Sequence, residues 1–389
     1  MHAHPWRHVA RAAAALAAAM GIGRFAFTPI LPLMTAQAHL TPQVAGHLAT
    51  ANYVGYLAGA LAGVASSRLA RSTTAFRVAL LVSVAGLAAM PLITDEIGWV
   101  AVRTVAGFVS ALIFVFAVNA MLDHLHAQPP HLPGWGLGGV GVGIALSAAV
   151  LLFAPVAAGW RGAWWAAAAL AAALSAAAWP LTTGTAKSGT APARPRAGGH
   201  RWFSLLMMSY TLEGIGYIIA GTFLVAAVQQ GTPGRLGGSA WLVVGLATIP
   251  SAAAWAWLST RRSHPTLLTA ALLLQAAGIA LAALVNNPVA ALVGALLFGA
   301  TFVGISTLSL AAGRLLRFPR AVALLTAGYS VGQILGPVAV APLLHRGFQP
   351  ALITSAVVIG AAALCAAWLR PGFGGPVRIA GRQPAAGVA

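Results

Sequence analysis

Long apolar runs separated by short polar segments fill the chain from residue 9 to residue 369. Each run is close to the roughly 20 residues that an α-helix needs to cross the hydrocarbon core of a bilayer. The pattern predicts twelve membrane-spanning helices, at 9–34, 45–67, 77–93, 98–122, 134–157, 161–181, 202–228, 239–259, 265–285, 288–312, 320–343 and 350–369. The first run has the basic start of a cleaved signal peptide, but it continues through Met34, beyond the length of a signal core. We therefore expect it to remain as the first helix.

The composition indicates the same fold class. Of the 389 residues, 59% are hydrophobic and only 7% are charged, and the mean hydropathy is +0.86. A soluble domain of this length would need far more charge to cover its surface. We expect an all-α polytopic membrane protein whose outer surface faces lipid.

The longest polar stretch lies between the sixth and seventh predicted helices. It runs from Thr182 to His200 and is rich in Gly, Pro, Ser and Thr, as flexible linkers are. The expected organisation is an N-terminal six-helix bundle (1–181), a cytoplasmic linker (182–200), a C-terminal six-helix bundle (201–370) and a cytoplasmic tail (371–389).

Short patterns recur in the two halves at a spacing of 193 residues. The pairs are Gly21-Ile22-Gly23 with Gly214-Ile215-Gly216, Arg68 with Arg261, and Gly55, Gly59 and Gly63 with Thr248, Ala252 and Ala256. Small residues at every fourth position allow helices to approach closely in lipid. Two related six-helix halves in parallel are typical of alternating-access transporters, so we expect two pseudo-symmetric bundles.

Basic residues are distributed unevenly between the two sides of the predicted membrane. With a cytoplasmic N-terminus, 17 of the 22 Lys and Arg residues fall on the cytoplasmic side, 3 on the other side and 2 within spans. Cytoplasmic loops carry such an excess, so both termini are expected in the cytoplasm, with the basic loops facing anionic membrane lipids. Nucleic-acid binding is not expected, because the arginines interrupt apolar runs and form no basic face.

Three blocks of sequence carry a family resemblance. They are GIGRFAFTPILPLM at Gly21–Met34, ATANYVGYLAGALAG at Ala49–Gly63 and LEGIGYIIAGTFL at Leu212–Leu224. With these blocks the chain resembles the major facilitator superfamily, and more closely its bacterial YbfB/YjiJ-type branch. The resemblance implies a twelve-helix transporter of the bacterial inner membrane, with a central cavity between two domains faced by helices 1 and 7. It implies no particular substrate.

Other superfamily motifs are present only in part. The segment from Arg103 to Gly107 is similar to the Arg-x-x-x-Gly pattern of the fourth helix, whereas the loop after the second helix, SSRLARSTTAFR, lacks the Gly and Asp of the gating motif. The fifth helix, GWGLGGVGVG, lacks the Gly-Pro of the antiporter signature, which argues against drug/proton antiport and leaves transport itself untouched.

Two charges fall near the middle of predicted spans, Arg24 in the first helix and Glu213 in the seventh. A charge in a span costs about 2.5–3.5 kcal/mol on insertion scales, so each requires a reason. Arg24 suits an anionic group, because guanidinium binds carboxylate bidentately, and Glu213 suits a proton carrier. Alternatively the two side chains pair with each other across the domain interface. Arg103 either assists proton transfer or bonds to carbonyl groups at a helix end.

Neutral polar residues accompany these charges. Tyr210 and Tyr217 share a helix face with Glu213, and Thr28 shares one with Arg24 at i, i+4. Further candidates for the substrate site are Asn52, Tyr56, Gln333 and, less centrally, Tyr53 and Asn119. For each of these the alternative is a hydrogen bond between helices.

The function expected is secondary active transport by rocking of two domains, with a small organic solute that carries a carboxylate and with protons as the coupling ion. The alternatives are efflux of amphipathic drugs or, in another class, a membrane-embedded enzyme, receptor or channel. Four acids, Asp95, Glu96, Asp123 and Glu213, do not supply an enzyme's site. The single cysteine, Cys365, and the scattered histidines predict no metal site, and we expect no cofactor and a monomer.

Overall fold

The computed structural model describes residues 5–125, 128–129, 131–153, 159–183, 199–231, 236–285, 287–318 and 320–373. All regular structure in these ranges is helical. The elements are α1 (Pro5–Leu16), η1 (Ala17–Ile22), α2 (Phe27–Gln37), α3 (Pro42–Ala65), α4 (Ser67–Arg71), α5 (Thr73–Ala89), α6 (Glu96–Leu125), α7 (Leu132–Leu137), α8 (Gly139–Phe153), α9 (Gly159–Ala178), α10 (Gly199–Gly231), α11 (Leu236–Leu258), α12 (His264–Leu284), α13 (Pro288–Leu315), α14 (Ala321–Val340), η3 (Ala341–Arg346), α15 (Gln349–Ala367) and η4 (Arg370–Gly372).

Each of the twelve predicted spans corresponds to helical structure. The first is formed by α1, η1 and α2 together, and the fifth by α7 and α8. Within the described ranges, ten helical segments are long and apolar enough to cross a membrane. The other two predicted spans are α5, apolar but 17 residues long, and the 20-residue α9. Most of the predicted linker and tail (184–198 and 374–389) lies outside the described residues.

Capping residues move several helix starts away from the predicted positions. α3 begins at Pro42, because the Thr41 hydroxyl accepts a hydrogen bond from Val44 N at 3.3 Å. Ser72 caps α5 in the same way through Ala75 N at 3.1 Å. The apolar windows placed these starts at 45 and 77. A polar N-cap and the first helical residues precede the apolar run, so the run alone predicts a start that is too late.

Large apolar side chains cover the outside of the molecule. Ile97 is 82% exposed and Phe153 81%, and many Leu, Val and Trp residues are exposed to a lesser degree. An apolar surface this extensive requires a lipid environment. The protein is therefore an all-helical membrane protein.

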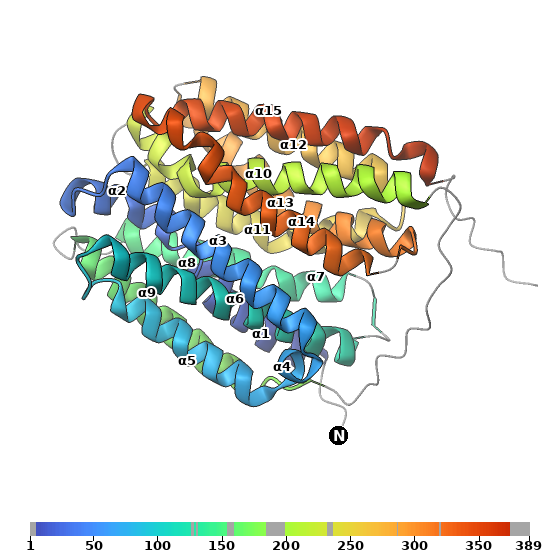
Figure 1. Cartoon of the computed structure of the whole chain (residues 1–389), viewed down its shortest axis with the longest axis horizontal. Helices are drawn as coiled ribbons and strands as arrows, with labels where there is room; N and C mark the ends of the chain where they lie inside the picture. Colours follow the sequence, from blue (N-terminus) through green and yellow to red (C-terminus); the bar gives the residue numbers. More distant parts are fainter. Residues whose placement is uncertain are drawn as a thin grey trace, which may run out of the picture.

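The helices form two groups with matching internal contacts, and Figure 1 shows α1 to α9 beside α10 to α15. In the first group α3 packs on α6, α5 on α6 and α9, and η1 on α8. In the second group the corresponding contacts are α11 on α13, α12 on α13 and α15, and α10 on α14. The groups meet where α8 packs on α11 and α3 on α14, with α2 against α10 between these two contacts.

A duplicated cap confirms the repeat at the level of single residues. The side-chain oxygen of Gln37 accepts a hydrogen bond from Trp160 N at 2.9 Å, just after Gly159 at φ +57°. Gln230, which lies 193 positions after Gln37, accepts one from Phe348 N at 3.0 Å, just after Gly347 at φ +100°. In both groups the first helix thus fixes the start of the last helix through a glycine in the left-handed region.

Candidate functional site

The first membrane helix is broken at Arg24. The π-helix η1 ends at Ile22, and α2 begins only at Phe27. Pro29 has no N–H group and so donates no backbone hydrogen bond. Thr28 N bonds to Phe25 O at 3.2 Å, whereas in an α-helix it would bond to Arg24 O. The Arg24 carbonyl is therefore left for another donor.

Arg103 of α6 supplies that donor. Its guanidinium donates to Gly23 O at 3.4 Å and to Arg24 O at 3.3 Å, and it lies over the Phe27 ring with 5.0 Å between Cζ and the ring centroid. The side chain is 2% exposed. Of the two roles considered for Arg103, this geometry is that of an arginine bonding carbonyl groups at a helix break.

Arg24 itself points toward α3 and α14. Its Nη2 donates to Gln333 Oε1 at 2.7 Å, and its Cζ lies 4.2 Å from the Tyr56 ring centroid and 4.8 Å from that of Tyr53. The Nε atom is buried and has no acceptor among the described residues. Arg24 thus joins Tyr56 and Gln333, two other predicted site residues, although the contact with Gln333 spans 309 positions of sequence.

Glu213 lies elsewhere, inside the second group of helices. It is fully buried, and neither carboxyl oxygen has a hydrogen-bond partner among the described residues. Gln275 of α12 lies beside it, and that amide also lacks a partner in hydrogen-bonding geometry.

The alternative of a direct Arg24–Glu213 pair is not what the structure contains. The ion pairs found in the described ranges are His47–Glu96 and Arg71–Asp123. Glu213 faces α12 and Arg24 faces α3 and α14, so the two charges occupy separate environments. Asp123 is held by Arg71 at 2.5 Å.

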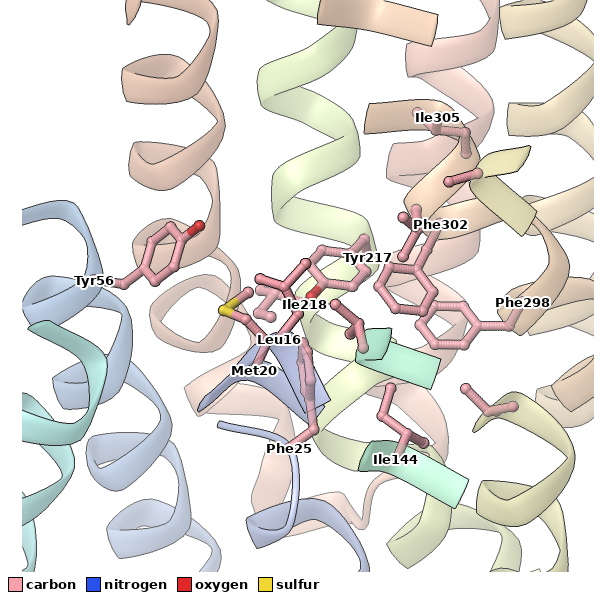
Figure 2. Close-up of a cluster of buried hydrophobic side chains, with 14 of the residues drawn as sticks. Leu16, Met20, Phe25, Tyr56, Ile144, Tyr217, Ile218, Phe298, Phe302 and Ile305 are labelled. Carbon is pink, nitrogen blue, oxygen red and sulfur yellow. The ribbon is translucent and has the colours of Figure 1, made fainter. Parts of the chain in front are cut away.

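All five tyrosines of the chain lie between Arg24 and Glu213 or next to one of them. Tyr210 stacks on Tyr329 with 4.4 Å between ring centroids, and Tyr217 stacks on Tyr329 at 5.8 Å and on Phe302 at 5.2 Å. Figure 2 shows Tyr217 beside Phe302 and Phe298, with Phe25 directed toward them and Tyr56 on the far side. Sequence reasoning missed Tyr329, Phe25 and Phe302; Tyr329 precedes Gln333 by one helical turn, which was the available signal.

Thr28 and Asn52 bond to backbone groups. The Thr28 hydroxyl donates to Gly221 O at 2.6 Å, across the contact between α2 and α10. Close by, the Tyr53 and Thr222 hydroxyls share a hydrogen bond of 3.1 Å. Asn52 Nδ2 donates to Arg103 O at 3.0 Å within the first group, which is the interhelical role considered as its alternative. Asn119, too, bonds a backbone carbonyl, that of Ala70 at 3.3 Å.

The candidate site is closed in this conformation. Arg24 and Tyr217 are each only 3% exposed, so both side chains are almost entirely shielded from solvent. A recess of about 340 Å³ lies along the first half of α10, away from Arg24, lined by Phe203, Ser204, Met207, Met208, Thr211 and Leu212. No group of three or more potential metal ligands occurs in the part of the chain that the structure describes.

Comparison with known proteins identifies the family. A family model described as "Uncharacterised MFS-type transporter YbfB" matches residues 16–369. A search of curated protein sequences found no significant match. Among solved structures, the nucleoside transporter NupG is similar, with a TM-score of 0.68, 11% identity, and coverage of 94% of this chain and 98% of that chain. Its D323A mutant is similar with a TM-score of 0.71, 12% identity, and coverage of 93% and 99%.

At such low identity the NupG structures show a shared fold only. The family match covers nearly the whole chain, and it names a family of transporters and not of enzymes. The chain therefore belongs to the YbfB-type family of major facilitator superfamily transporters.

Proposed function

We propose that this transporter moves a small organic solute carrying a carboxylate group, and that Arg24 binds that group. The observation that carries the proposal is the uncompensated charge at the centre of the molecule. Arg24 is buried, its Nε has no acceptor, and no carboxylate lies within ion-pair distance of it in the described ranges. A buried cation without a counter-ion is costly, and an anionic ligand in the opened site would remove that cost.

Glu213 is proposed as the proton carrier. A carboxylate buried without a hydrogen-bond partner is far more costly than the neutral acid. A change in its surroundings, such as water entering from one side, would therefore load or release a proton. The tyrosines between Glu213 and Arg24 connect the proposed proton site to the proposed anion site.

The proposed movement is a rocking of the two bundles, 1–181 and 201–370, about the contact between α2 and α10. The matching contacts of α8 with α11 and of α3 with α14 support it, because a pseudo-symmetric pair of contacts can open on one side while the other closes. We further propose that both termini are cytoplasmic, on the asymmetry of basic residues. The protein is proposed to act as a monomer in the bacterial inner membrane.

The test is ligand-dependent thermal stabilisation of the detergent-purified protein. The panel contains monocarboxylic and dicarboxylic acids, amino acids, cationic amphiphiles and, because the similar structures are nucleoside transporters, uridine and adenosine. The variants are Arg24→Ala and Arg24→Lys. Arg161→Ala, which removes an exposed arginine next to Trp160, serves as the control for charge removal.

The proposal expects at least one acid to stabilise the wild type and Arg161→Ala but not Arg24→Ala. Arg24→Lys should be stabilised less than the wild type, since an ammonium group lacks the bidentate geometry. Stabilisation only by cationic or neutral compounds, equal in Arg24→Ala, would show that the anion assignment is wrong and would favour efflux of amphipathic compounds.

A further inference from the structure

Phe25 occupies a socket of three aromatic rings in the second group of helices. Its ring centroid lies 6.5 Å from that of Tyr217, 6.5 Å from that of Trp241 and 6.3 Å from that of Phe302. All three contacts are edge-to-face, with interplanar angles of 79°, 62° and 72°. The walls come from α10, α11 and α13, whereas Phe25 comes from the break in the first helix, so the socket accepts a ring from the opposite bundle. Figure 2 shows Phe25 with two of these walls, Tyr217 and Phe302.

The charge of Arg24 lies next to this socket. Arg24 precedes Phe25 in sequence, and its Cζ is 5.5 Å from the centroid of the Phe25 ring. The interface therefore presents a cation and a ring position side by side. This pairing is the complement of a molecule with a carboxylate attached to an aromatic ring.

Opening of the interface must empty the socket. Phe25 belongs to the segment 23–26 between η1 and α2, which holds no regular helix, and it moves with the first bundle. When that bundle separates from α10, the faces and edges of three rings become accessible to an entering molecule. A planar ring would restore the edge-to-face contacts that Phe25 provides in the closed conformation.

The socket also contains an unused hydrogen-bond donor. Trp241 is 1% exposed, and its indole N–H has no acceptor among the described residues. Buried indole N–H groups normally have a partner. An oxygen or nitrogen substituent on the incoming ring would provide one.

We propose that the cargo is an aromatic carboxylate, whose ring takes the place of Phe25 in the socket of Tyr217, Trp241 and Phe302 while its carboxylate binds Arg24. This proposal rests on the proposed function and specifies in addition that the cargo contains an aromatic ring. Phe25 then occupies the position of the cargo ring in the closed conformation.

Phenylacetate and cyclohexylacetate are the probes, because they share charge and chain length and differ in the aromaticity of the ring. Dissociation constants are measured by calorimetry on the detergent-purified full-length chain. For the wild type we expect phenylacetate to bind about tenfold more tightly, since each aromatic contact adds to the area it buries. Phe302→Leu should bring the two constants close together while cyclohexylacetate binding persists.

Phe298→Leu is the matched control. Phe298 lies one turn from Phe302 on α13 and stacks on Tyr217 and Phe302, but it makes no ring contact with Phe25. The preference for phenylacetate should survive in this variant. If Phe302→Leu does not yield folded protein, Trp241→Leu removes another wall of the socket and should have the same effect on the ratio.

Equal binding of the two acids to the wild type would overturn the aromatic proposal and leave the carboxylate function standing. Absence of phenylacetate binding would also overturn it, and the wider panel of acids would then decide the proposed function separately. If both acids bind Arg24→Ala as tightly as the wild type, the anion site and the aromatic proposal are both wrong.

Discussion

Thr28 and Gly221 are joined by a hydrogen bond of 2.6 Å and lie 193 positions apart, the same spacing that relates the two halves of the sequence. Each residue thus contacts its own counterpart in the other half. Such a contact lies on the pseudo-two-fold axis, where the first helix of one bundle meets the first helix of the other. The α2–α10 contact is therefore the natural pivot or gate of the interface.

Replacing Thr28 with Val should weaken the closed conformation. The exchange keeps the shape of the side chain and removes the donor to Gly221 O, so the two bundles lose a buried hydrogen bond worth about 1 kcal/mol. We expect a lower melting temperature for the detergent-purified protein. Thr35→Val is the control, because the Thr35 hydroxyl bonds to Leu31 O of its own helix. An equal decrease in melting temperature in both variants would mean that the hydrogen bond between the bundles stabilises the protein no more than one within a helix.

Much of the architecture could be predicted from the sequence, because the features that determine it are local or periodic. Apolar runs gave the number of helices, and a spacing of 193 residues related Gly21 and Gly23 to their counterparts. The charged residues Arg24 and Glu213 could be recognised for the same reason. The sequence did not predict the neighbours of these two charges: Arg24 donates to Gln333, and Glu213 lies beside Gln275.

Partners of this kind depend on the rotation of each helix about its axis. A helix in lipid has little polar–apolar contrast between its faces, so the sequence does not report which face points inward. The ring contacts of Phe25 were missed for this reason, since an aromatic residue in an apolar run is equally compatible with a lipid-facing position.

Arg103→Met separates the two roles considered for that residue. If Arg103 holds the break in the first helix, the variant leaves the Gly23 and Arg24 carbonyls without their donor, at about 1–3 kcal/mol per group. We expect a clearly lower melting temperature, together with weaker binding of acids, because Arg24 is no longer positioned. A variant with the wild-type melting temperature and acid binding, but without proton-driven uptake, would instead assign Arg103 to proton transfer.

Glu213→Gln should preserve the fold and abolish coupling. Glutamine matches the neutral acid in shape and carries no charge to bury, so we expect a melting temperature equal to or above that of the wild type. In proteoliposomes, exchange of labelled solute should continue while accumulation driven by a pH gradient is lost.

The control for coupling is Glu96→Gln, which removes a carboxylate that is 45% exposed and bonded to His47. Accumulation should persist in this variant. Accumulation by Glu213→Gln at the wild-type level would remove Glu213 from the coupling mechanism.

The paired glutamines Gln37 and Gln230 offer a test of the internal repeat in energetic terms. Each accepts the first N–H after a glycine with positive φ, so replacement by Ala leaves one backbone donor without its partner. We expect each single variant to lose about 1–2 kcal/mol of stability. The two caps share no partner residue, so the losses should add in the double variant.

Gln43→Ala, at an exposed position of α3, should leave the melting temperature unchanged. A large loss in one single variant and none in the other would show that the two caps are not equivalent, and that the pseudo-symmetry of the fold does not extend to the energetics of these caps.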